Sequence, residues 1–207
     1  MSFKKTLNTM SRYLFQRSLL ISFGFFLIYS SNAQEILWEK SYGGTHSEYL
    51  FDAIPTADYG FILAGSSLSG KSGNKAMASA GNFDYWIWKM DEKGDLDWQH
   101  SFGGSGTDHL NSIRSTSDGG YILAGTSNSP KDGDKKEESY GQEDFWIIKL
   151  NAEGAEQWQK TLGGKGRDEV KAVRPTADGG YVVGGSSASR PDEVKTAPIM
   201  AVWIIGL

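Results

Sequence analysis

Three tryptophans, Trp38, Trp98 and Trp158, lie 60 residues apart, and the residues around them recur at the same interval. Each is followed by an aromatic residue or leucine with two glycines after it, and then by a Thr-x-Asp-x-Gly-aromatic segment. A fixed period sustained at many positions is typical of stacked supersecondary units. The chain is therefore expected to form three repeat units, at about 38–97, 98–157 and 158–207, the last incomplete.

The units are predicted to be all-β. In the second copy, four strand-like runs at 97–102, 110–116, 121–126 and 145–150 are separated by glycine-rich turns. The third and fourth runs are apolar at successive positions, which is typical of strands buried on both faces. Four-stranded antiparallel sheets covered by like sheets occur in β-propellers. Because a closed propeller typically has about four to eight blades, we expect blade-like repeats in a partial or open β-propeller.

The Thr-x-Asp turns contain the most regular acidic residues. Asp58, Asp118 and Asp178 occupy the same place in every copy, so we interpret them as turn caps that accept a backbone amide two residues on, and not as acids or metal ligands. The first copy has Tyr59 where the others have glycine. We therefore expect Gly60 to supply the positive φ of that turn.

Two lysines end the fourth strand-like run of the first two copies. Lys89 and Lys149 follow a Trp-Ile-Trp or Trp-Ile-Ile segment. We expect them to form salt bridges with Asp84 and Asp144 or to lie at a solvated edge, which is a structural and not a catalytic role.

One loop is rich in carboxylates, at Asp132, Asp134, Glu137, Glu138, Glu143 and Asp144. Hard cations prefer several carboxylate oxygens, so this loop is the best candidate for a cation site. It lacks the spacing of an EF-hand loop, and the first copy does not repeat it. A solvated charged loop is the favoured interpretation.

Other residues that could carry chemistry form no recognisable motif. His46, His100 and His109 show no nucleophile-histidine-acid order or metal-ligand spacing. The glycine-rich segment 103–106 resembles a phosphate-binding loop only in composition, because the lysine and the following helix are missing. Tyr140 could stack on a sugar, but nothing singles it out. We predict no catalytic, cofactor-binding or metal-binding residue.

The first 33 residues are predicted to be a helical signal peptide. Four basic residues and no acid occur there, an apolar run covers 19–29, and small residues precede a cleavage site after Ala33. The apolar run is shorter than the roughly 20 residues that span a bilayer. We therefore expect export to the extracellular space or cell surface, with no stable membrane span after cleavage.

Cleavage would leave 17 lysines and arginines against 25 acidic residues. Such a negative balance repels phosphate backbones, so nucleic acid is not an expected partner. The chain has no cysteine, which excludes disulfides, thiolate metal sites and cysteine nucleophiles.

The pattern W-x-K-S-Y-G-G, T-x-D-G-G-Y-I-L-A-G-T-S and D-F-W-I-I-K-L-N resembles a family of secreted bacterial repeat proteins, over residues 35–207. The resemblance implies β-propeller blades, often followed by a type IX secretion sorting domain. Its hairpin is also locally similar to the Asp-box of sialidases, which is structural there. No sorting domain follows the repeats here, and Ala201 and Gly206 replace the Asp and Lys of the last motif, so a truncated array is expected.

These observations predict a secreted, non-enzymatic structural or interaction module with an unknown protein or glycan ligand and no cofactor. Self-association through open sheet edges is also expected. One alternative is a propeller-type polysaccharide hydrolase or lyase with paired, non-repeating carboxylates at a channel mouth. Another is a non-functional fragment of a longer repeat protein.

Overall fold

The structure is a computed structural model that describes residues 35–190 and 200–205, the latter by backbone alone. The predicted signal peptide lies outside these residues. The chain divides into two compact units, Met1–Glu39 and Lys40–Leu207. All described strands belong to the second unit, and the described part of the chain contains no helix.

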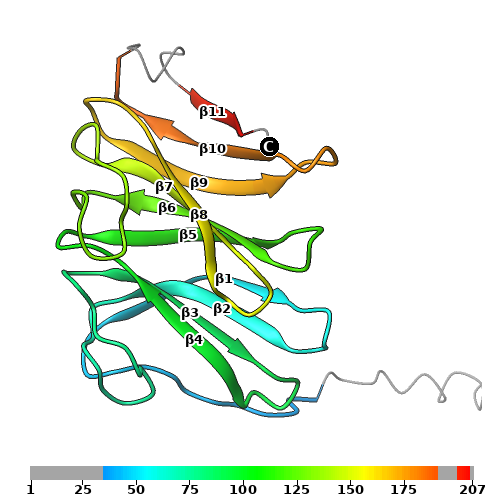
Figure 1. Ribbon diagram of the computed structural model, residues 1–207. Coiled ribbons are helices and arrows are strands. Elements are labelled where there is room, and N and C mark those ends of the chain that lie inside the picture. The colour runs from blue at the N-terminus through cyan, green and yellow to red at the C-terminus, as the bar shows by residue number, and fades with distance from the viewer. Residues whose placement is uncertain (1–34, 191–199, 206–207) are drawn as a thin grey trace, which may run out of the picture. The chain divides into compact units, whose positions relative to one another are not determined.

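Antiparallel strands form three sheets that follow one another along the chain (Figure 1). The first sheet has the order β1 (Glu48–Pro55), β2 (Phe61–Ser67), β3 (Asp84–Met90) and β4 (Leu96–Phe102). The second has the order β5 (Asp108–Ser115), β6 (Tyr121–Ser127), β7 (Asp144–Leu150) and β8 (Glu156–Leu162). The third contains β9 (Asp168–Pro175), β10 (Tyr181–Ser187) and β11 (Met200–Ile205) in that order. The prediction of tandem antiparallel sheets is confirmed.

The sheets are offset from the sequence units. Trp98 lies in β4, the last strand of the first sheet, and Trp158 lies in β8, the last strand of the second. Each tryptophan run therefore completes the sheet of the preceding copy. Residues 35–47, which include the corresponding first run, contain no strand. The reason is that β4 and β8 form by pairing with β3 and β7, and no equivalent strand precedes this run among the described residues.

The three sheets stack face to face in Figure 1. Strand β5 contacts β1, β2 and β3, and β9 contacts β5, β6 and β7. One apolar core lies between the first two sheets and a second lies between the last two. Every residue of β6 and β7 is buried, which confirms, for this sheet, the prediction from its continuous apolar runs.

An equivalent hydrogen bond occurs at each of the two sheet junctions. The amide of Leu110 donates to Ser66 Oγ at 2.9 Å, and the amide of Val170 donates to Thr126 Oγ1 at 3.1 Å. At the first junction, the Tyr85 hydroxyl also donates to the Trp146 carbonyl at 3.0 Å. Repeated polar contacts therefore fix the register of one sheet on the next.

Candidate functional site

The Thr-x-Asp turns are capped as predicted. The carboxylates of Asp58, Asp118 and Asp178 each accept a hydrogen bond from the amide two residues on, at 3.1–3.3 Å. In every turn the preceding threonine hydroxyl donates to the same carboxylate. These aspartates hold the backbone and leave little capacity for a ligand.

The prediction that Gly60 supplies the positive φ was wrong. Tyr59 itself has φ 64°, at the position where Gly119 and Gly179 have φ 81° and 88°. Gly60 is needed for space instead, because a Cβ there would lie 2.2 Å from the Met90 carbonyl oxygen. The first turn therefore holds a tyrosine in a backbone region that favours glycine.

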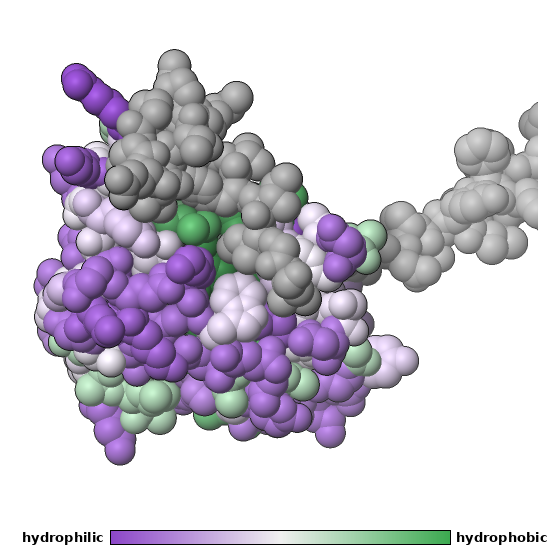
Figure 2. Space-filling model, turned by 45° about the horizontal axis from the view of Figure 1, so that its top comes forward, coloured by the Kyte–Doolittle hydropathy of each residue, from purple (hydrophilic) through white to green (hydrophobic). Residues whose placement is uncertain are grey.

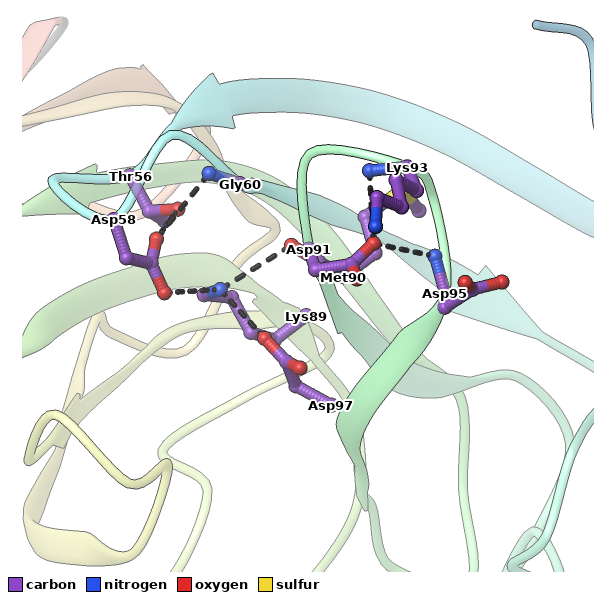
Figure 3. A network of polar contacts seen from close by, with 9 residues as sticks. All are labelled: Thr56, Asp58, Gly60, Lys89, Met90, Asp91, Lys93, Asp95 and Asp97. Carbon is purple, nitrogen blue, oxygen red and sulfur yellow. Dashed lines mark hydrogen bonds and ion pairs between the residues drawn. The ribbon is translucent and has the colours of Figure 1, made fainter.

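Lys89 neither pairs with Asp84 nor lies at a solvated edge, so both predicted alternatives were wrong. Lys89 Nζ donates to Asp58 Oδ2 and Asp97 Oδ2, each at 2.8 Å, and to the Met90 carbonyl at 3.2 Å (Figure 3). Its side chain is only 5% exposed. The lysine thus ties the Thr-x-Asp turn to β3 and β4, while the neighbouring turn in Figure 3 is capped separately by Asp91.

Lys149 repeats this arrangement in the second sheet. Its Nζ lies 2.8 Å from Asp118 Oδ2 and 3.0 Å from Gln157 Oε1, and no ion pair to Asp144 is formed. Hydrogen bonds from the lysine and then from the turn threonine lower the pKa of Asp58 and of Asp118 to about 2. Both groups are therefore structural anions.

Asp84 and Asp144 lie at the start of β3 and β7, buried beneath the loops. Asp84 Oδ2 accepts the Ala80 amide at 2.7 Å, and Asp144 Oδ2 accepts the Tyr140 amide at 2.6 Å. Burial raises the pKa of each to about 6. The Oδ1 atoms of Asp84 and Asp144, and that of Asp108, are buried without a hydrogen-bond partner in the described chain.

The carboxylates of the acidic loop are dispersed rather than convergent. Asp132 Oδ1 accepts the Ser105 amide at 2.9 Å, and Asp134 Oδ2 accepts the Gly103 amide at 3.2 Å. Asp108 Oδ2 accepts a hydrogen bond from the Gly104 amide at 2.9 Å. The amides of residues 103–105 thus bind the protein's own acids, and that of Gly106 donates to Ser129 Oγ at 3.0 Å, which argues against a phosphate loop. The residues with described placement contain no group of three or more potential metal ligands.

The three histidines have different surroundings. His46 is exposed and its ring lies 3.1 Å from the Thr45 hydroxyl. His100 stacks against Trp98, with ring centroids 5.2 Å apart. His109 lines a cavity. Tyr140, the tyrosine considered for sugar stacking, is 41% exposed.

A cavity of about 390 Å³ crosses the first strands of all three sheets. Its lining includes two residues of β1, two of β5 and three of β9, namely Tyr49, Phe51, His109, Asn111, Glu169, Val170 and Lys171. We call this cavity the first-strand groove. It was not found from the sequence, because only stacking of the sheets brings these strands together.

The groove is lined by the positions at which the copies differ. Tyr49, His109 and Glu169 share one repeat position, as do Phe51, Asn111 and Lys171. The position between them keeps the same character, with leucine in the first two copies and valine in the third. The differences at these two positions, beside one that stays apolar, are the sequence signal that could have indicated a binding surface.

Charged groups at one end of the groove pair with one another. Arg167 forms ion pairs with Glu143 and Glu169, the latter at 2.9 Å. The hydrogen bond from Lys171 lowers the pKa of Glu169, and burial lowers the pKa of His109. The histidine is therefore neutral and the glutamate ionised at neutral pH.

The other end of the groove combines aromatic and uncharged polar groups. Tyr49 and Phe51 are 50% and 48% exposed, with ring centroids 6.2 Å apart. His109 Nδ1 and Asn111 Oδ1 are buried without hydrogen-bond partners in the described chain. Exposed rings beside unsatisfied polar groups are typical of sites that bind polar ligands with apolar faces.

Comparison with models of known families gave no match, and no match was found among curated proteins. In the described part of the chain, no helix is both long and apolar enough to cross a membrane.

Proposed function

We propose that this chain is a secreted, non-enzymatic repeat module that binds a glycan in the first-strand groove. Export is inferred from the signal-like residues 1–33 and from the resemblance to secreted bacterial repeat proteins. The observation that carries the binding proposal is that one groove crosses the first strands of all three sheets and is lined there by side chains that differ from copy to copy.

The chemistry of the groove fits a carbohydrate. The rings of Tyr49 and Phe51 offer apolar faces, and sugars present apolar faces bounded by hydroxyls. His109 and Asn111 supply hydrogen-bonding atoms, and the charged side chains of Arg167 and its partners add donors and acceptors at the other end. The groove crosses three sheets, which suits an extended oligosaccharide better than a compact metabolite.

Hydrolysis is the second candidate function, since the groove contains two carboxylates. A glycosidase needs one carboxyl group whose raised pKa lets it protonate the leaving oxygen. Glu169 has a lowered pKa, and Glu143 is held by the same arginine, Arg167. This pairing supports binding over proton transfer.

The proposal is tested by titrating the protein with a panel of soluble polysaccharides by calorimetry and affinity electrophoresis. Phe51→Ala and Asn111→Ala should each weaken binding by about tenfold, the loss expected when one stacking or hydrogen-bonding group is removed. Tyr59→Gly is the matched control, because it removes an exposed aromatic ring outside the groove. Equal losses in all three variants, or no binding to any polysaccharide, would contradict the proposal.

Two parallel measurements separate the alternatives. Release of reducing or unsaturated sugar ends during the same incubations would indicate a hydrolase or lyase. A non-cooperative unfolding transition would support the non-functional fragment. Fusion of residues 1–33 to a reporter tests export, and cell retention of that reporter would contradict secretion.

A further inference from the structure

The outer face of the first sheet is built like a sheet–sheet interface but has no described sheet against it. A cavity of about 290 Å³ lies on this face, lined by residues that include Leu50, Leu63 and Trp86. Leu50 is 62% exposed, whereas Leu110, its equivalent in the second sheet, is fully buried. In the second sheet this face is covered by the first sheet.

The third sheet carries the complementary face. In the second sheet, Ile122 and Ala124 pack on the third sheet and are fully buried. Their equivalents, Val182 and Gly184, lie in β10, where both are partly exposed. Figure 2, in which the third sheet comes toward the viewer, shows a small hydrophobic patch on this side, with hydrophilic residues below it.

The sequence just before β1 contains a segment suited to the edge of the third sheet. Strand β11 pairs with β10 only, so its other edge carries no described strand. Residues 37–42 are the repeat equivalent of β4 and β8, which occupy that edge in the other sheets. Tyr42 packs on Trp88, with ring centroids 4.5 Å apart. Its equivalent, Phe102, belongs to the core between the first two sheets.

We propose that the third sheet of a second copy of this chain occupies this site. Residues 37–42 of one copy add to the free edge of β11 in the other, and the outer faces of the first and third sheets pack together. The connection from the added strand into β1 then matches the connection from β4 into β5. Residues 1–34 contain no copy of the repeat motif.

The two sheet junctions within one chain predict which residues should be in contact between the two copies. The amide of Leu50 should donate to Ser186 Oγ of the second copy, as Leu110 does to Ser66 and Val170 to Thr126. Pairing like that of β7 with β8 places Lys40 opposite Val202 of the other chain, by analogy with Lys160 opposite Ile147, because Val202 pairs with Gly184 as Ile147 pairs with Ala124.

Two copies joined reciprocally would form one closed ring. The described residues supply three sheets per chain, and six is within the range of about four to eight blades found in propellers. Both junctions are equivalent under a two-fold axis, so association stops at the dimer rather than continuing into a fibre.

The test begins with the solution mass of the full chain by sedimentation equilibrium, where twice the chain mass is expected. Leu50→Arg should raise the dimer dissociation constant at least about tenfold, because the charge would be buried at the junction. Leu96→Arg is the matched control, since Leu96 is an exposed leucine, 45% exposed, on β4 and outside this face. A monomeric wild-type chain, or equal effects of the two variants, would overturn the proposal.

Cysteine cross-linking tests whether the partner is a second copy of this chain. The sequence has no natural cysteine, so only the introduced cysteines can form a disulfide. Lys40→Cys protein mixed with Val202→Cys protein should give a disulfide-linked dimer on oxidation. Lys40→Cys mixed with Glu153→Cys, an exposed turn position, should not. If the double variant Lys40→Cys/Val202→Cys closes only within single chains, or if neither mixture cross-links, the proposed partner is wrong.

Discussion

The first and second sheets have nearly the same sequence pattern but very different surroundings. Trp146 of the second sheet is fully buried and contacts Tyr85 of the first, with ring centroids 4.9 Å apart. Trp86, at the same repeat position, lines an open cavity. The comparison shows that each repeat produces a sheet face with apolar side chains. Whether that face is buried depends only on whether a neighbouring sheet packs against it.

Replacing the two tryptophans is the most direct way to break this equivalence. Trp146→Ala should cost about 3–5 kcal/mol of unfolding free energy, because it leaves a cavity between two sheets. Trp86→Ala should cost about 1 kcal/mol in the monomer, because the ring is already partly hydrated. Urea unfolding at low protein concentration measures both values. Equal costs would mean that the uncovered face is buried in solution.

The buried acids Asp84 and Asp144 should make the free energy of unfolding depend on pH. Asp84 and Asp144 have folded-state pKa values raised by burial to about 6, while an unfolded aspartate titrates near 4. The folded protein therefore binds more protons between these values, and its stability should fall as pH rises from about 4 to about 6.

Asparagine variants test each junction separately. Asp144→Asn, and then Asp84→Asn, should each reduce the fall in stability between pH 4 and pH 7 by up to about 3 kcal/mol. Asparagine keeps an oxygen to accept the loop amide but carries no buried charge. Urea midpoints measured across this range provide the check, and slopes as steep as that of the unmodified protein would show that these acids are not the cause.

The Thr-x-Asp turns of the second and third sheets differ by one lysine. Asp118 binds Lys149, which is 3% exposed, while Asp178 has no ion pair within the described residues. Asp118→Ala should cost about 2–3 kcal/mol, because a buried lysine loses its anion. Asp178→Ala should cost about 1 kcal/mol, the value of a turn cap alone. Comparable losses in thermal unfolding would show that the lysine contributes little.

Local chemistry made some features predictable from the sequence. The Asp58 cap depends only on residues two positions apart, and the repeat made the sheets themselves predictable. The partner of Lys89 was missed because strand pairing, not sequence distance, carries its Nζ toward the Thr-x-Asp turn. The residues around Trp38 are the repeat equivalent of the strand around Trp98, but they form no strand, because a strand needs a paired neighbour.

The groove was missed for a related reason. Tyr49, His109 and Glu169 are each unremarkable in the sequence, and stacking of the sheets makes them line one cavity. Comparing the copies position by position would have indicated them, since these positions change while Leu110 and Val170 beside them stay apolar.

The smallest expected effect concerns the turn in which the first sheet departs from the second. Tyr59 holds φ 64°, whereas Gly119 holds φ 81° without a side chain. Tyr59→Gly should stabilise the protein by about 1 kcal/mol, because the left-handed conformation costs a non-glycine residue about that much and the ring, 81% exposed, loses little packing. Glycine also loosens the unfolded chain, so the gain is an upper value. Gly119→Ala should lower the melting temperature, and a Tyr59→Gly protein less stable than the parent would mean that the tyrosine ring makes a stabilising contact.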